Sequence, residues 1–416
     1  MVHPQSLSDS FRQILHSSRT DKGFMILLLV TFFPLTYKII SPFLIIAGLG
    51  AYSEYINGTL YTIGVLLALP LIRTNIRVTD IFVYLVFSFL FFASPLVYPM
   101  SEDFVCENMQ NILLKFVPFY FLGVMVNYNR DKGLLRLVMR IAFLIALFWQ
   151  VCLMMGLVDI ESEDGTLGEQ MDFAYSLLVV IMYMLIEYNN THDKIELLSF
   201  LIGSLMLLFM GTRGPVVIWA IFVVTYLLLF HKFETKNIAK KLGIVSLFFI
   251  FYIFSTPIVM CLSLIAERIG MSTKIFDSFL GNSLISLEES SGRDTIYADM
   301  WKAISDDPTG FGYGFGGDRL FSASNGYAHN FELEILVQFG YFGAAFLFLI
   351  LLILFIRSYS KAKQARSGEF WLVIFFWGFM SLQFSKSWLL HEGFFFMIGY
   401  FISVQRNNGK TVYINE

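Results

Sequence analysis

Long apolar runs follow one another along most of this chain, separated by short polar segments. A helix needs about 20 apolar residues to cross the hydrocarbon core of a bilayer. The runs that meet or approach this length lie at residues 24–49, 57–72, 79–98, 111–127, 134–157, 172–188, 195–210, 214–230, 241–261, 332–356, 369–384 and 388–404. They predict an all-α polytopic membrane protein with about twelve transmembrane helices. Whether residues 24–49 form one span or two stays open, because Pro34 and Lys38 interrupt that run.

The basic residues between the runs predict an orientation. Lys and Arg concentrate in segments that face the cytoplasm. With the N-terminus inside, most Lys and Arg residues fall in cytoplasmic segments, whereas the outer segments 101–107 and 159–164 are acidic and contain neither. We therefore expect residues 1–22 and 405–416 to be cytoplasmic tails, and both termini to lie in the cytoplasm.

This topology places residues 262–328 outside, as one large loop between nine spans in residues 23–261 and three spans in residues 329–404. Loops longer than about 15 residues are uncommon unless they are functional. Hydrophobic residues recur at helical spacing at Ile296, Met300 and Ile304, after a candidate N-cap at Ser291. We expect an amphipathic helix over residues 292–305.

A glycine-rich segment follows this helix. Five of the eight residues from Gly310 to Gly317 are glycine. Two interpretations stay open: a flexible turn, or a backbone that approaches a phosphate or sugar closely and binds it through its N–H groups. The second interpretation makes Gly310, Gly312 and Gly314 candidate substrate-binding residues.

The composition supports a membrane protein and excludes some functions. Of the 416 residues, 56% are hydrophobic and 15% are charged, whereas an ordinary soluble domain has about 25% charged residues. The net charge of −3 argues against a nucleic-acid partner. The three cysteines are widely spaced and form no His/Cys cluster, so the sequence predicts neither a metal site nor a cofactor.

Basic residues on the outer side depart from the orientation rule and are candidates for anion binding. Arg213 lies in the tight turn 211–215, and Arg293 begins the predicted loop helix. Arginine suits bidentate binding of phosphate. Arg319 and Lys386 are further outer cations that we include as substrate-binding candidates, although each also fits a solvated surface.

His329 stands where the outer loop ends and the tenth span begins. Its imidazole suits a general base near neutral pH, although a lone histidine at such a position is more often a hydrogen-bonded structural residue. His391 is a weaker candidate of the same kind. Glu332 and Glu334 are placed to orient either ring.

The residues around His329 resemble the signature of the O-antigen ligase and O-antigen polymerase superfamily. His329-Asn330 is followed after nine residues by Gly340-x-x-Gly343. The turn 212–214 is similar to the Thr/Ser-Arg-Gly turn of that superfamily, and the Arg293 segment resembles the part of its periplasmic loop that precedes the histidine. Ala344 departs from the pattern of the ligases and favours a polymerase.

The resemblance implies a metal-independent glycosyltransferase at the outer face of the bacterial cytoplasmic membrane. Its donor would be an oligosaccharide linked to undecaprenyl diphosphate. His329 would act as the base, Arg213 and Arg293 would bind the diphosphate, and Asn330 would contact the substrate. A chain-length regulator and a flippase are the protein partners that such an enzyme would have.

Three functions stay open. The first is a polymerase that joins repeat units into O-antigen, capsule or exopolysaccharide, and the second is a ligase that transfers glycan to lipid A-core. The third is a repeat-unit transporter or flippase. Transporters usually have ionisable residues near the middle of the membrane; Lys38 and Lys115 are the main candidates for that role.

Overall fold

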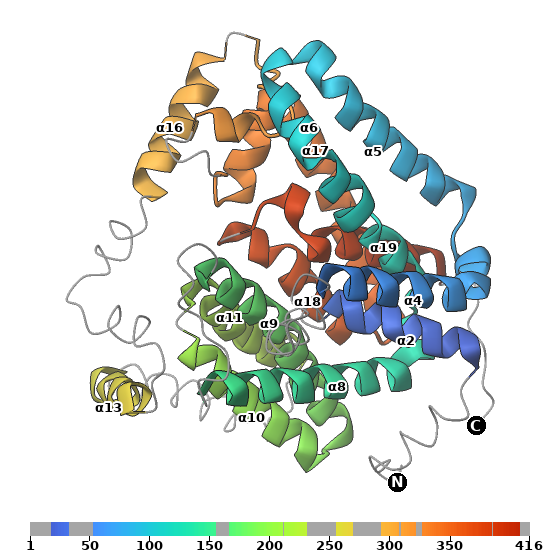
Figure 1. Ribbon diagram of the computed structural model, residues 1–416, viewed down its shortest axis with the longest axis vertical. Helices are drawn as coiled ribbons and strands as arrows, with labels where there is room; N and C mark the ends of the chain where they lie inside the picture. Colours follow the sequence, from blue (N-terminus) through green and yellow to red (C-terminus); the bar gives the residue numbers. More distant parts are fainter. Residues whose placement is uncertain are drawn as a thin grey trace. The chain divides into compact units, whose positions relative to one another are not determined.

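The computed structural model of the protein describes residues 18–32, 53–154, 166–210, 212–230, 255–268, 293–307, 309–321, 327–384 and 386–407. These residues form helices and connecting turns, and none of them is in a strand. The all-α prediction is therefore confirmed for this part of the chain. The chain divides into two compact units, one of residues 1–138 with 292–416 and one of residues 139–291 (Figure 1).

The first unit contains most of the helices. They are α2 (Arg19–Phe32), α4 (Ser53–Asn75), α5 (Val78–Val97), η2 (Pro99–Ser101), α6 (Glu102–Gln110), the π-helix η3 (Asn111–Phe116), α7 (Phe119–Met125), the start of α8 (Tyr128–Met154), α16 (Arg293–Asp306), η4 (Gly317–Leu320), α17 (Phe331–Gln364), α18 (Gly368–Gly378), η5 (Met380–Gln383), η6 (Trp388–Leu390) and α19 (Glu392–Asn407). Helices α2 and α4 lie side by side (Figure 1).

Aromatic side chains hold α17, α18 and α19 together. Phe355 of α17 lies 5.4 Å from Phe375 of α18 and 5.6 Å from Phe401 of α19, measured between ring centroids. The Trp371 ring stacks on Phe401 at 4.8 Å. Offset-stacked and edge-to-face pairs at such distances add to the stabilisation that burial gives. Phenylalanine, with 46 copies in the chain, thus supplies packing between helices.

The second unit contains the rest of α8, α9 (Thr166–Thr191), α10 (Lys194–Phe209), α11 (Arg213–Phe230) and α13 (Ser255–Arg268). Asp193 caps α10 by accepting the N–H of Ile195 at 3.0 Å. Arg140 of α8 donates to Asp193 at 2.9 Å and to buried Glu196 at 2.7 Å. This paired cluster fixes α8 against the start of α10.

Four described helices are long and apolar enough to cross a membrane: Val78–Val97, Tyr128–Val151, Phe173–Thr191 and Phe331–Gln364. Two shorter apolar helices, Thr62–Asn75 and Gly214–Phe230, accompany them. These helices agree with a membrane protein. The count of about twelve spans and the outer position of the large loop stay predictions. Lys38, Ser291, the acidic segment 159–164 and all of residues 241–254 and 269–292 lie outside the described residues.

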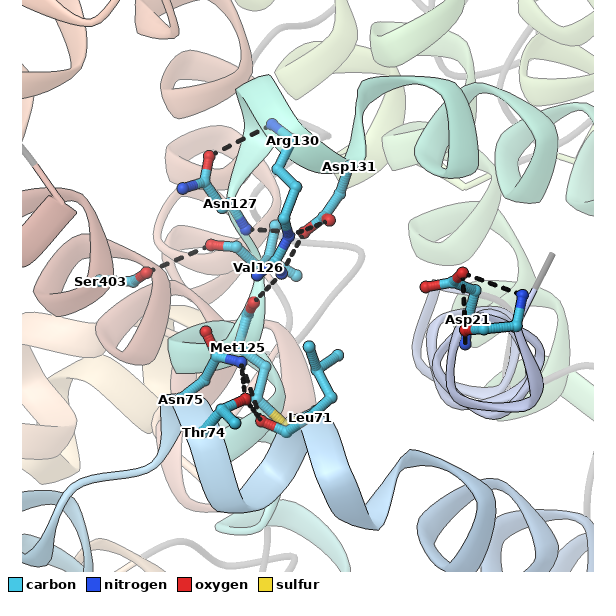
Figure 2. Close-up of polar contacts among 11 residues, drawn as sticks. Asp21, Leu71, Thr74, Asn75, Met125, Val126, Asn127, Arg130, Asp131 and Ser403 are labelled. Carbon is cyan, nitrogen blue, oxygen red and sulfur yellow. Dashed lines mark hydrogen bonds and ion pairs between the residues drawn. The ribbon is translucent and has the colours of Figure 1, made fainter. Parts of the chain in front are cut away.

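The turn between α7 and α8 is held by a polar cluster (Figure 2). Arg130 donates to the carbonyl of Met125, the last residue of α7, at 3.0 Å and pairs with Asp131 at 2.6 Å. Ser403 of α19 donates to the carbonyl of Val126 at 3.2 Å. The free carbonyls at a helix end need such partners. Arg130, a basic residue that predicts a cytoplasmic turn, therefore also caps a helix.

The loop helix exists and is α16, so its prediction is confirmed with bounds shifted by one residue. It lies beside the first turns of α17 (Figure 1). Met300 and Ile304 are buried against Leu333 and Val337 of α17. The apolar face of α16 thus packs on protein, and Trp301 remains half exposed, with 51% of its surface accessible.

We expect Met300→Ala to loosen the docking of α16 by about 2–5 kcal/mol, because it removes buried side-chain volume and leaves a cavity. Hydrogen exchange over residues 293–306 in the full-length protein in detergent would measure this loss. Lys302→Ala, at an exposed position of the same helix, serves as the control and should change exchange little. Equal protection in wild type and Met300→Ala would contradict the packing described.

Candidate functional site

Helix α17 contains a break at Gly340, whose φ of 63° and ψ of −173° are not helical. A break in a helix leaves carbonyl groups without their intrahelical donors, and buried carbonyls need other partners. The carbonyl of Val337 accepts the N–H of Tyr313 at 3.0 Å, and the carbonyl of Gln338 accepts the N–H of Gly314 at 2.8 Å. The glycine-rich segment therefore fills the break in α17.

Close backbone contact explains why this segment is rich in glycine. Gly310, Gly312, Gly314 and Gly316 all have positive φ, between 69° and 83°. A Cβ atom on Gly340 would overlap the carbonyl group of Gly310. The two backbone segments therefore lie too close together for a side chain on Gly340. The segment is a fixed part of the packing.

The N–H groups of this segment already have acceptors. The N–H of Gly312 donates to Asp307 at 2.8 Å, and that of Gly314 donates to α17 as described. The same Asp307 accepts the hydroxyl of Thr309 at 2.8 Å. Substrate binding by Gly310, Gly312 and Gly314 stays a prediction, and it would have to use groups other than these two N–H donors.

His329 lies immediately before α17 in a rare conformation. Its φ is 52°, and such a conformation in a residue other than glycine costs about 1–3 kcal/mol and persists only where the surrounding structure enforces it. The next residue, Asn330, caps α17 by accepting the N–H of Leu333 at 3.0 Å. The pair His329-Asn330 thus combines a strained residue with a helix cap.

The Nδ1 atom of His329 is buried and has no hydrogen-bond partner among the described residues. The half-buried ring lies 4.2 Å from the ring of Tyr327, measured between centroids. A buried polar atom without a partner is uncommon in folded proteins and often belongs to a functional site.

Arg293, the first residue of α16, influences the pKa of His329 through its charge. Burial of the ring and the positive charge of Arg293 lower the pKa of the His329 imidazole to about 4. The ring is therefore neutral at neutral pH and able to accept a proton. Two of the three residues that the sequence marks as catalytic lie in one electrostatic neighbourhood.

Arg319 joins this neighbourhood through Tyr327. Its guanidinium carbon lies 4.3 Å from the centre of the Phe104 ring and 5.9 Å from the centre of the Tyr327 ring. Cation–π contacts of this kind hold an arginine in place. Its Nη1 atom is buried without a hydrogen-bond partner in the part of the chain that is described. Aromatic rings thus hold the candidate cation Arg319 in place, and the Tyr327 ring contacts both Arg319 and the His329 ring.

A buried polar network next to this site was not foreseen from the sequence. Gln338 donates to Asp318 at 2.8 Å and accepts from the indole N–H of Trp388 at 3.1 Å. Ser387 donates to Glu334, whose carboxylate is completely buried. The available signal was the pair Glu334 and Gln338, four residues apart on one face of an apolar helix, because polar residues within spans are expensive to bury.

The weaker candidates occupy structural positions. His391 is 1% exposed, and its Nε2 atom lies 3.0 Å from the carbonyl oxygen of Trp377. Glu332 accepts a hydrogen bond from Gln383 at 3.0 Å, so its described contact is with the turn that follows α18. Lys386, half-buried beside Ser387, belongs to the same turn.

Arg213 belongs to the second unit, where it is the first residue of α11. Its side chain and Gly211 lie outside the described part. The hydroxyl oxygen of its neighbour Thr212 is buried without a partner among the described residues. The role expected for Arg213 stays a prediction.

Within the described ranges, no group of three or more His, Cys, Asp and Glu residues is arranged to hold a metal ion. The described groups at this site include an imidazole and arginine side chains.

No curated protein sequence matches the chain, and no solved structure matches it. The sequence model of a protein family described as O-antigen ligase does match, over residues 198–348. This range contains Arg213, Arg293, the glycine-rich segment, His329 and the break at Gly340. Over residues 198–348 the chain is similar to this family, and the match supports the resemblance to the superfamily of O-antigen polymerases and ligases.

Proposed function

We propose that the protein is a polymerase that joins undecaprenyl-diphosphate-linked oligosaccharide repeat units into O-antigen, capsule or exopolysaccharide at the outer face of the cytoplasmic membrane. The observation that carries this proposal is the buried Nδ1 atom of His329, which is neutral and without a partner among the described residues. A neutral imidazole carries one N–H, so Nδ1 acts as the general base in the tautomer that has its proton on Nε2. The family match supports the class of reaction.

The transfer is a displacement at the anomeric carbon of the donor sugar. A hydroxyl oxygen of the acceptor forms a bond to that carbon, and the bond from the carbon to the diphosphate oxygen breaks. The electron pair leaves with undecaprenyl diphosphate, and the hydroxyl proton goes to Nδ1 of His329. Diphosphate is a good leaving group, so no strong general acid is required.

Positive charge has two tasks in this proposal. Arg293 offsets the charge that the diphosphate gains as the bond breaks, which lowers the barrier. The bound diphosphate in turn offsets the effect of Arg293 on His329, so the pKa of the imidazole rises on binding and the ring becomes a stronger base. Arg213 and Arg319 are proposed as further phosphate contacts; for Arg213 the support is its place in the turn 212–214 alone.

The family description favours a second candidate, a ligase that transfers finished glycan to lipid A-core. A gel of surface polysaccharide from a deletion strain tests the two. A polymerase deletion should leave single repeat units on the core, whereas a ligase deletion should leave full-length glycan on the lipid carrier. Normal chains in the deletion strain would contradict both.

A transporter is the alternative from another class. Purified protein in liposomes that moves labelled repeat units across the bilayer without joining them would establish transport and contradict the proposed polymerase. No contact among the described residues specifically supports transport, and Lys38 lies outside them.

We expect the activity of the purified protein to be constant from neutral pH down to about pH 5 and to fall as the pH approaches the pKa of His329, about 4. The reason is that the base must be unprotonated, and its pKa lies well below the ordinary value. The pH profile of kcat/KM, which reports on the free enzyme, measures this. An acidic limb at the ordinary histidine pKa of about 6.5 would contradict the described environment.

A further inference from the structure

The backbone at His329 is strained and has a hydrogen-bonded residue on each side. The backbone of His329 has a φ of 52°. The residue after His329 is Asn330, which is fixed because it caps α17. The residue before His329 is Ala328, which is completely buried. Its N–H donates to the Oδ2 atom of Asp318 at 3.1 Å.

We propose that Asp318 is a positioning residue for His329. Its Oδ2 atom fixes the Ala328 N–H, and its Oδ1 atom accepts from Gln338 of α17. One buried carboxylate thus joins the peptide that leads into His329 to the helix that follows it. Because Ala328 and Asn330 are both fixed by hydrogen bonds, His329 keeps its strained backbone conformation and the buried position of its Nδ1 atom.

The location of Asp318 in the fold supports this role. It lies on η4, directly after the glycine-rich segment that fills the break in α17. Asp318 is completely buried, and burying a polar group is costly unless it is hydrogen-bonded, as both of its oxygens are here. A carboxylate oxygen also accepts a backbone N–H more strongly than a neutral acceptor does.

The charged groups around His329 come from each element packed near it. Among the described residues, Arg293 on α16 acts on the ring itself, Asp318 on η4 binds the preceding residue Ala328, Arg319 on η4 contacts Tyr327, and Glu334 on α17 contacts Gln338. In this described part of the chain, burial of the ring and the charge of Arg293 are the causes that lower the pKa of His329. A changed titration of the ring in an Asp318 variant therefore reports that the ring has moved or become hydrated, because Asp318 itself does not cause the shift.

The first test is independent of the proposed function. The full-length protein in lipid nanodiscs, with its six histidines labelled with 13C, is titrated by NMR, and His329 is assigned by its absence in His329→Asn. In wild type we expect a pKa of about 4. In Asp318→Ala we expect it to rise toward the ordinary value of about 6.5, whereas Asp318→Asn, which keeps one oxygen acceptor, should restore a value closer to wild type.

Ser387→Ala is the matched control, since it removes a hydrogen bond from the same buried network but leaves the bond to Ala328 intact. We expect it to leave the titration of His329 unchanged. An unchanged titration in folded Asp318→Ala would overturn the proposal, as would an equal shift in Ser387→Ala. If Asp318→Ala does not fold, hydrogen exchange of the Ala328 amide in wild type decides: fast exchange overturns the proposal, and strong protection supports it.

The second test rests on the proposed function. The same variants are expressed in the deletion strain, and surface polysaccharide is compared on gels at equal protein amounts. A displacement of a catalytic group by about 1 Å costs about 10²-fold in rate, so Asp318→Ala should lose long chains while Ser387→Ala keeps them. A shifted titration together with normal chains would retain the positioning of His329 and refute its role as the base.

Discussion

Replacing His329 with asparagine is expected to abolish long polysaccharide chains while the protein remains inserted in the membrane. A positioned general base contributes about 10²–10⁴-fold to a reaction rate, and asparagine cannot take up the proton. Asparagine also tolerates positive φ better than most residues, so the backbone at 52° is preserved. The measurement is the chain-length distribution on gels of surface polysaccharide, with protein abundance checked by immunoblot.

His192→Asn provides the control for this substitution. His192 also has a positive φ, of 55°, and is exposed, so the same exchange is made at a similar φ in a residue to which the proposed mechanism gives no role. We expect it to leave chain lengths unchanged. Wild-type chain lengths in His329→Asn would contradict the proposed mechanism.

Arg293→Ala should give the same loss of long chains, because the charge that develops on the diphosphate is then no longer offset. It should also raise the pKa of His329, since the positive charge of Arg293 is one of the two causes that lower it. Arg293→Lys retains the charge but loses the planar pair of donors, and we expect partial activity from it. An unaltered titration of His329 in Arg293→Ala would contradict the electrostatic contact.

Gly340→Ala is the second substitution with a large expected effect, and it acts through the fold. With a φ of 63° and a ψ of −173°, Gly340 occupies a region that is essentially restricted to glycine. A Cβ atom there would also overlap the carbonyl of Gly310. We expect the glycine-rich segment to lose its contact with α17, and activity and thermal stability to fall together.

Gly133→Ala is the matched control for this prediction. Gly133 lies within α8, and no atom lies within 4 Å of the position of an added Cβ. Alanine is favoured over glycine in a helix by about 1 kcal/mol, so the variant should be as stable as wild type or more so. Melting temperatures of the purified proteins and polysaccharide gels provide the comparison; a Gly340→Ala protein that matches Gly133→Ala in both would contradict the described break.

The sequence alone predicts the helices well where one periodicity extends over many residues. Apolar runs correctly predict helices at α5, α8, α9 and α17, and the spacing of Met300 and Ile304 predicts α16. The motif around His329 resembles that of the superfamily, and the family match over residues 198–348 supports this resemblance. These features are local, because a helix is specified by residues three and four positions apart.

The break in α17, the docking of the glycine-rich segment and the Asp318 network are features that only the tertiary structure decided. Each joins residues distant in sequence, such as Gly310 with Gly340 and Asp318 with Gln338. The glycines alone were compatible with a flexible turn or with an anion site, and their contact with backbone carbonyls excludes a freely flexible turn.

The chemistry of His329 divides in the same way. The sequence determined that a histidine stands at the start of a membrane helix, next to a residue that caps it. The tertiary structure decided that this ring is neutral and that its Nδ1 is buried, because burial and the charge of Arg293 depend on how α16 and α17 pack together. A pKa is set by the groups that surround a side chain in space, and the order of residues in the chain does not specify that distance.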